Sequence, residues 1–109
     1  FVIDKTAFST VTINYNWRTA LHKDAGDFKR GFGNLVVLEE GKYKGGYTGF
    51  PRFKVAVDVR HFDFIAMDVH EWHCNTKIVP QSKDYTRLSL VSYLRENMIK
   101  CKNRSLFLV

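Results

Sequence analysis

Two histidines, one aspartate and one arginine are the residues of this sequence most suited to chemistry. His22 and Asp24 form a His-x-Asp pair, and His73 and Arg87 follow later in the chain. Two imidazoles and one carboxylate on one face of a metal ion leave coordination positions open, as in non-haem Fe(II) oxygenases. An arginine fork binds a carboxylate through paired hydrogen bonds. The set predicts an enzyme that uses Fe(II), 2-oxoglutarate and O₂, a dioxygenase.

The third metal ligand has to come from outside the His-x-Asp pair. His22 and Asp24 lie two positions apart, so on an extended segment their side chains turn to the same side. The remaining histidines are His61, His70 and His73. We predict His73, because it ends an apolar strand and precedes a turn-prone segment. His70 is the second candidate, and His61 is typical of a turn.

Residues 7–21 alternate between apolar and polar side chains, a period-two pattern that predicts a strand. We expect the apolar side to pack in a core and the polar side to line a cavity that holds His22. A surface strand with a solvated polar side is the alternative. Arg18 shares the parity of His22 and is our candidate for a cavity residue that touches substrate or co-substrate; a paired structural arginine is the other interpretation.

Short strands separated by turn signals account for the rest of the chain. We expect strands at 35–38, 53–59, 62–69 and 86–94, loops at 24–34, 41–51 and 75–85, and a short helical turn at 96–102. This pattern predicts an all-β antiparallel sandwich or barrel. The 109 residues are expected to form one core domain, 1–109, and the absence of an initial methionine leaves open that it is a piece of a longer chain.

The chain is basic, with 17 Lys and Arg against 11 Asp and Glu and a net charge of +6. Such an excess attracts polyanions, although many basic domains bind no nucleic acid. A group of loop residues could form a phosphate-binding rim, and ordinary solvated loop residues are the alternative for each of its members. The basic members of that rim are Lys23, Lys29, Arg30, Lys42, Lys44, Arg52 and Lys54, and the aromatic residues available for stacking on bases are Tyr43, Tyr47 and Phe50.

The composition also bears on the expected location of the protein. No apolar stretch approaches the roughly 20 residues that a membrane span needs, so we expect a soluble protein with no membrane partner. Cys74 and Cys101 cannot make a disulfide framework, which favours a reduced intracellular compartment, cytoplasm or nucleus. We expect a monomer.

Several segments together resemble the TET/JBP family of nucleic-acid dioxygenases. They are residues 19–24, 33–37, 63–76 and 87–93, and the resemblance covers about 8–93. The family comprises enzymes that oxidise the methyl group of thymine or 5-methylcytosine, and it has relatives in phages, large viruses, fungi and protists, so a viral or phage origin is open. The resemblance implies a double-stranded β-helix, a jelly-roll or cupin-like barrel to which short helices can be attached.

The resemblance also implies roles for individual residues. His22 and Asp24 match the proximal iron ligands, and His73 matches the distal one. The matches to the 2-oxoglutarate site are Arg87, which binds the distal carboxylate, Ser89, whose hydroxyl assists it, and Asn14, which resembles a strand asparagine that reaches the co-substrate. The departures from the family pattern are Cys74, Lys77 and Phe62, which stand where glycine, proline and glycine are common.

The implied function is oxidation of the 5-methyl group of thymine or 5-methylcytosine in nucleic acid, which we expect to be DNA. Two alternatives stay open. The same barrel and ligands serve hydroxylases of protein side chains and of small metabolites. A non-catalytic jelly-roll binding module is the other alternative, and it would require four positions to match by chance.

Overall fold

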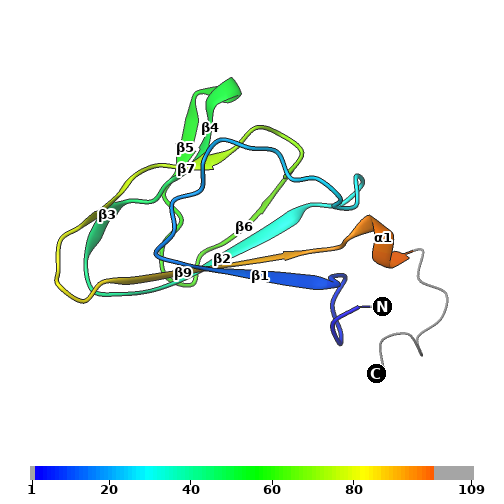
Figure 1. The fold of residues 1–109 in the computed structure, drawn as a ribbon, viewed down its shortest axis with the longest axis horizontal. Coiled ribbons are helices and arrows are strands. Elements are labelled where there is room, and N and C mark those ends of the chain that lie inside the picture. The colour runs from blue at the N-terminus through cyan, green and yellow to red at the C-terminus, as the bar shows by residue number, and fades with distance from the viewer. Residues whose placement is uncertain (1, 100–109) are drawn as a thin grey trace.

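The computed structural model describes residues 2–99, which form short β-strands with very little helix (Figure 1). The elements are β1 (Thr10–Tyr15), β2 (Gly33–Glu40), β3 (Tyr43–Gly45), β4 (Thr48–Phe50), the 3-10 helix η1 (Pro51–Phe53), β5 (Val55–Val57), β6 (Phe64–Met67), β7 (Cys74–Asn75), β8 (Ile78–Pro80), β9 (Thr86–Tyr93) and α1 (Glu96–Ile99). The all-β class is confirmed. Among the described residues, no helix has the length and apolar character that crossing a membrane requires.

The strands form three antiparallel sheets. The largest has the order β1-β9-β2-β6, a second has the order β5-β4-β7, and β3 pairs with β8. β1 and β9, the first and last strands among the described residues, are therefore neighbours, and β9 lies between β1 and β2. In this four-stranded sheet no two strands that follow each other in the chain are paired, which agrees with the expected double-stranded β-helix fold.

The hydrophobic core lies on the inner face of the four-stranded sheet. Leu35 and Val37 of β2 are buried, and Val59 packs with them. Residues two apart on a strand point to the same side, so β2 presents both side chains inward. The partly buried side chains that complete the core are Val57, Ile65 and Val91. The core is small and shares the inner face of the sheet with polar residues.

The two sides of β1 agree with the prediction on the polar side only. Val11, Ile13 and Tyr15 are 42%, 63% and 64% exposed, so the expectation that they pack in a core is wrong. Thr12 and Asn14 line a cavity, as expected for the polar side. β1 is an edge strand whose inner face meets the polar cavity, and its apolar side lies on the outer face of the sheet.

The first strand also ends earlier than the sequence pattern predicts. Asn16 has φ of 49°, a left-handed conformation that asparagine tolerates better than most residues. Its side-chain oxygen accepts a hydrogen bond from the Arg87 backbone N–H at 2.6 Å. Beyond Asn16 the chain leaves the sheet, so His22 does not continue the alternation of β1. It is held instead by an isolated bridge to His73.

Other predicted boundaries are corrected in the same way. The expected loop 41–51 contains β3 and β4, and the expected loop 75–85 contains β8. These strands have three residues each, too few for a period-two pattern to be visible. The expected strand 53–59 is reduced to β5, because residues 51–53 form η1. The predicted helical turn begins at Glu96 as expected, and its residues 100–102 lie outside the described residues.

A pair of substitutions tests this assignment of core and surface. Leu35→Ala should lower the free energy of unfolding by about 2–5 kcal/mol, because it leaves a cavity in the core. Ile13→Ala should change it by about 0.5 kcal/mol or less, because that side chain is mostly exposed. Urea denaturation of both variants gives the comparison. A larger loss for Ile13→Ala than for Leu35→Ala would contradict the observed packing.

Candidate active site

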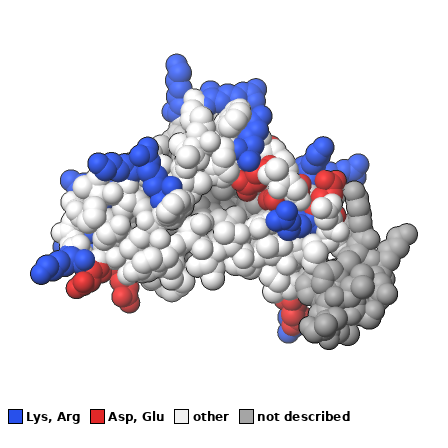
Figure 2. Space-filling view, viewed as in Figure 1, with Lys and Arg blue, Asp and Glu red and all other residues white. Residues whose placement is uncertain are grey.

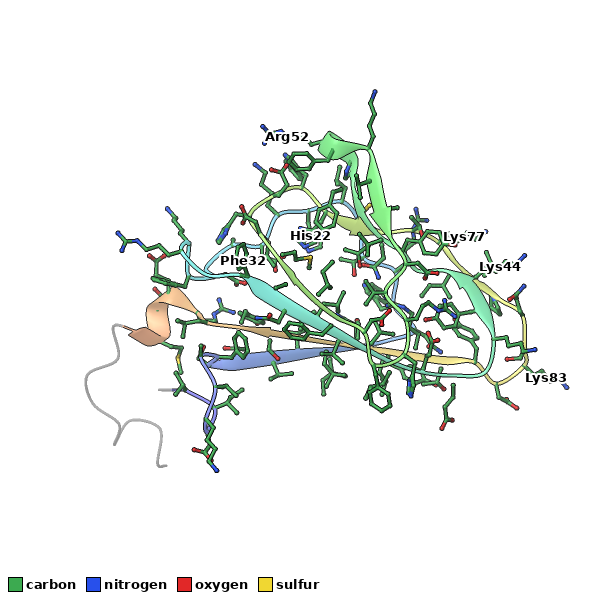
Figure 3. The ribbon with its side chains drawn as sticks, turned by 180° about the vertical axis from the view of Figure 1, so that it is seen from behind. His22, Phe32, Lys44, Arg52, Lys77 and Lys83 are labelled. Carbon is green, nitrogen blue, oxygen red and sulfur yellow. The ribbon has the colours of Figure 1, made fainter. Side chains whose placement is uncertain are left out.

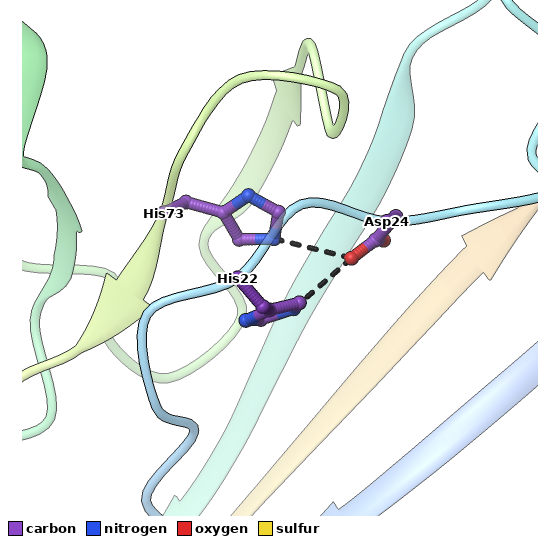
Figure 4. A group of neighbouring side chains, drawn as sticks. All are labelled: His22, Asp24 and His73. Carbon is purple, nitrogen blue, oxygen red and sulfur yellow. Dashed lines mark ion pairs between the residues drawn. The ribbon is translucent and has the colours of Figure 1, made fainter.

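The side chains of His22 and Asp24 converge with that of His73, which is distant in the sequence (Figure 4). Asp24 Oδ1 lies 3.0 Å from His22 Nε2 and 3.4 Å from His73 Nε2. One ligand atom from each of the three residues lies within 4.8 Å of the other two. Two atoms about 2.1 Å from one ion and at right angles to each other are about 3.0 Å apart, so this spacing fits a shared metal ion.

A reciprocal backbone bridge fixes the two histidines. The His22 N–H donates to the His73 carbonyl at 3.0 Å, and the His73 N–H donates to the His22 carbonyl at 3.0 Å. The rings therefore lie next to each other, with centroids 4.3 Å apart. Neither ring depends on a flexible loop for its position, because each backbone holds the other.

Each imidazole is also oriented by a carbonyl two residues earlier. His22 Nδ1 lies 2.7 Å from the Ala20 oxygen, and His73 Nδ1 lies 2.7 Å from the Glu71 oxygen. A carbonyl can only accept, so each Nδ1 carries a proton, and Nε2 is the nitrogen that is left to bind a metal ion when it is deprotonated. In that state two lone pairs and a carboxylate oxygen face one another. A cation removes the repulsion among them, which is the usual arrangement of metal-ligating histidines.

The electrostatics of the three groups are coupled. Burial alone would raise the pKa of Asp24, but the hydrogen bonds and charges of His73 and His22 outweigh it and lower that pKa. Burial alone would lower the pKa of His73, but the hydrogen bond to Asp24, the Glu71 carbonyl and the Asp24 charge outweigh it and raise that pKa. Both shifts show that the site attracts positive charge to the space beside Asp24.

The other two described histidines have structural partners elsewhere. His70 Nδ1 lies 3.2 Å from Asp68 Oδ1, and its Nε2 lies 3.2 Å from the Asp27 carbonyl. His61 Nδ1 accepts a hydrogen bond from the Glu39 N–H at 2.9 Å. The structure therefore brings His73, and neither His70 nor His61, to the His-x-Asp pair.

The three residues open into a cavity of about 400 Å³ between the four-stranded sheet and the β5-β4-β7 sheet. Its walls combine the inner face of β1 and β9 with residues of β4 and β7. The polar residues that line it next to the metal-binding triad are Thr12, Asn14, Thr19, Thr48, Asn75 and Ser89. A hollow of this size, with polar groups on several strands, can hold a small dicarboxylate and part of a larger substrate.

Arg87 of β9 is fully buried, with 1% of its surface exposed; it does not itself line this cavity, but Ser89, two positions later on the same side of β9, does. One guanidinium nitrogen donates to the Gly46 carbonyl at 3.1 Å, and Nε has no hydrogen-bond partner among the described residues. A Cβ on Gly46 would lie 3.1 Å from Nε, and the φ of Gly46 is +69°. Glycine is therefore needed where the chain passes the guanidinium. A buried cation with an unsatisfied donor is costly unless an anion meets it.

The other predicted co-substrate residues lie on the inner face near Arg87. Ser89 follows two positions later on β9, is buried, and is paired in register with Asn14 of β1. Thr48 of β4 is 2% exposed and its hydroxyl has no hydrogen-bond partner among the described residues. Arg18 is exposed and is not one of the cavity residues, because the break at Asn16 ends the alternation on which that prediction depended.

Asp27 is a cavity residue that the sequence reasoning missed. It is buried, it lines both this cavity and a neighbouring one of about 340 Å³, and its Oδ2 has no hydrogen-bond partner among the described residues. Burial and the negative charge of Asp24 raise its pKa. Its position three residues after Asp24, in a charged glycine-containing segment, made it look like a surface loop residue.

Comparison with known proteins identifies the family to which this chain belongs. The family model Tet_JBP, described as the oxygenase domain of the 2OGFeDO superfamily, matches residues 1–96. The bifunctional helicase and thymine dioxygenase JBP2 of Leishmania infantum is 38% identical over 94 residues, which are 86% of this chain and 8% of that protein. The thymine dioxygenase JBP1-A of Trypanosoma cruzi is 39% identical over 95 residues, 85% of this chain and 11% of that protein. The chain thus spans about a tenth of the length of these relatives.

A solved structure shares the fold. NgTET1 in complex with 5mC DNA superposes with a TM-score of 0.68 over 82% of this chain and 34% of that chain. The sequences are 16% identical in this comparison, so the likeness concerns the fold.

Metal binding tests the assignment of the three ligands. Asp24→Ala and His73→Ala should each weaken Fe(II) binding by more than about 100-fold. Loss of a residue that only hydrogen-bonds to a metal ligand typically costs roughly 10- to 100-fold, and here a ligand itself is removed. His70→Ala is the matched control and should bind Fe(II) like the unaltered chain. Anaerobic calorimetric titration measures the affinities, and circular dichroism checks the fold. Weakened binding in His70→Ala with unchanged binding in His73→Ala would refute the assignment.

Proposed function

We propose that this chain hydroxylates the 5-methyl group of thymine or 5-methylcytosine in DNA. The premise is that the chain belongs to the Tet/JBP family, the oxygenase domain of the 2OGFeDO superfamily. The observation that carries the proposal is the cavity and its surroundings. His22, Asp24 and His73, whose ligand atoms converge, line it together with Ser89. Arg87, a buried arginine with an unsatisfied donor, lies two positions before Ser89 on the same side of β9. An enzyme that couples a metal ion to a dicarboxylate needs both groups close to one cavity.

The residues present fit Fe(II) and 2-oxoglutarate. His22, Asp24 and His73 would hold the metal through two imidazole nitrogens and one carboxylate oxygen, a donor set typical of non-haem iron. When bound together with O₂, iron and 2-oxoglutarate supply the oxidant that hydroxylates a C–H bond and leave succinate and CO₂. The protein contributes the ligands, the orientation of the co-substrate and a protected cavity.

The co-substrate role of Arg87 follows from its burial. Its guanidinium would bind the distal carboxylate of 2-oxoglutarate, and the contact would satisfy the Nε donor left free by Gly46. The Thr48 and Ser89 hydroxyls lie in the cavity wall and would donate to the same carboxylate. Because Arg87 is buried and its backbone is fixed by Asn16, the co-substrate would be oriented before the DNA arrives.

Two observations support DNA as the substrate. The relatives that match most of this chain include thymine dioxygenases, and the structural match is a complex with 5mC DNA. Basic side chains also gather on the surface, above all over the β4–β5 hairpin (Figure 2). The prediction that Tyr43 is available for stacking on bases is wrong, because its side chain is 3% exposed and donates a hydrogen bond to Glu39.

We propose that the enzyme acts inside the cell.

Replacement of Arg87 tests the co-substrate site. Arg87→Lys keeps the charge but loses the planar fork, so it should raise the 2-oxoglutarate concentration needed for half-maximal turnover by about 10- to 100-fold. Fe(II) affinity should stay unchanged, because Arg87 is not a ligand. Arg60→Lys, which alters an arginine paired with Glu39 outside the cavity, is the control. An Arg87→Lys variant that saturates at the same 2-oxoglutarate concentration would contradict the assigned role.

The substrate is tested by analysing nucleosides. DNA containing thymine and 5-methylcytosine is incubated with the protein, Fe(II), 2-oxoglutarate and ascorbate, then digested and examined by mass spectrometry. A hydroxymethylated base should form and should be absent with His22→Ala. Succinate production without a modified base would reject DNA methyl groups as the substrate and keep the iron site.

A further inference from the structure

A short hairpin projects from the body of the protein beside the candidate active site (Figure 1). β4 and β5 pair in register from Thr48↔Val57 to Phe50↔Val55, and η1 forms the tip between them. The Lys54 N–H donates to the Pro51 carbonyl at 3.1 Å and closes the turn. Lys54 has φ of 53°, and Pro51 fixes its own φ, so the tip has one defined conformation.

The tip displays a large apolar side chain to solvent. Phe53 is 59% exposed and Val55 is 50% exposed. The Phe53 ring has the guanidinium carbon of Arg52 at 5.5 Å and is not a member of the hydrophobic core. Because the Phe53 ring buries little surface in this fold, it is free to contact another molecule.

The hairpin is tied to the segment that carries a metal-binding residue. Arg52 Nη1 lies 3.0 Å from Glu71 Oε2, and the Glu71 carbonyl accepts the hydrogen bond of His73 Nδ1 at 2.7 Å. β4 also pairs with β7, which begins immediately after His73. Figure 3 shows Arg52 at the hairpin and His22 below it. The tip therefore stands at a fixed place relative to the metal-binding triad.

The surface around the tip has the charge that suits a polyanion. Arg52 and Lys54 flank Phe53, and all residues from 51 to 56 are exposed. On the other side of the Glu71 segment, Lys23 Nζ lies 5.0 Å from the centre of the Trp72 ring, and that ring is 45% exposed. Basic side chains next to exposed aromatic rings match the phosphates and bases of DNA.

We propose that the hairpin tip is a wedge that inserts Phe53 into the base stack of duplex DNA next to the nucleotide that enters the active site. A base methyl group inside a duplex is reached only after the nucleotide is flipped out, which costs a few kcal/mol of unstacking. In other DNA-binding proteins, apolar side chains enter a base step, partly unstack it and kink the duplex. Here the inserted ring takes over part of the stacking that the flipped base has lost, which offsets part of this cost. Lys54 binds a neighbouring phosphate, and the Arg52–Glu71 pair holds the wedge in register with the metal-binding triad. The inference rests on the proposed DNA substrate.

The test compares duplex and single-stranded substrates. Phe53→Ala should reduce turnover on a duplex with one target base about tenfold or more, because the variant no longer offsets the cost of unstacking. Turnover on the same sequence as a single strand should change by less than about twofold, since no flipping is needed. Phe53→Trp should keep duplex turnover. Phe62→Ala is the matched control and should behave like the unaltered chain. It also removes an exposed phenyl ring, but Phe62 lies in a turn, belongs to no named strand and does not line the cavity.

A binding readout separates this inference from the proposed function. A duplex with 2-aminopurine next to the target base brightens when its stack is opened. The unaltered chain and Phe62→Ala should brighten it on binding, and Phe53→Ala should not. Equal brightening by Phe53→Ala, or an equal loss of turnover on both substrates, would overturn the wedge and leave the iron chemistry intact. If no chain oxidises a base, the DNA function fails, and the 2-aminopurine signal still decides whether Phe53 opens the stack.

Discussion

The reciprocal backbone bridge between His22 and His73 is the contact on which the site depends. It joins the irregular segment after β1 to the segment before β7, and it sets two imidazole rings side by side. The carbonyls that accept each Nδ1–H then point both Nε2 atoms at Asp24. Six backbone groups, four in the bridge and two carbonyls that accept from the rings, thus prepare a site for a cation, so little reorganisation is needed when it arrives.

The four-stranded sheet also buries a second charged group. Arg87 lies on the inner face of β9, where glycine at position 46 lets the chain pass close to the guanidinium. Burying such a cation destabilises a protein unless an anion compensates it. The proposed co-substrate carboxylate would relieve this cost, and Ser89, two positions later on β9, lines the cavity through which it would approach.

The all-β class and most candidate site residues could be predicted from the sequence, because their side-chain chemistry and their positions on strands point to the same role. Arg87 and Ser89 were identified through the family resemblance, and they lie two positions apart on the long strand β9, so the structure has both on one face. The period-two rule failed for β1, because alternation shows that a strand has two different faces but does not show which one is covered. The strands at 43–45 and 48–50 were hidden by their length and glycines. Asp27 was missed because its burial is created by contacts with distant segments.

The joint binding of metal and co-substrate tests the central claim most directly. Fe(II) and 2-oxoglutarate are titrated into the protein without oxygen, and the visible absorption band that arises when 2-oxoglutarate chelates iron is followed. The account predicts one Fe(II) and one 2-oxoglutarate per chain, with a band that requires both and is absent from Asp24→Ala. A chain that binds neither ligand, or that forms the same band without Asp24, would contradict it.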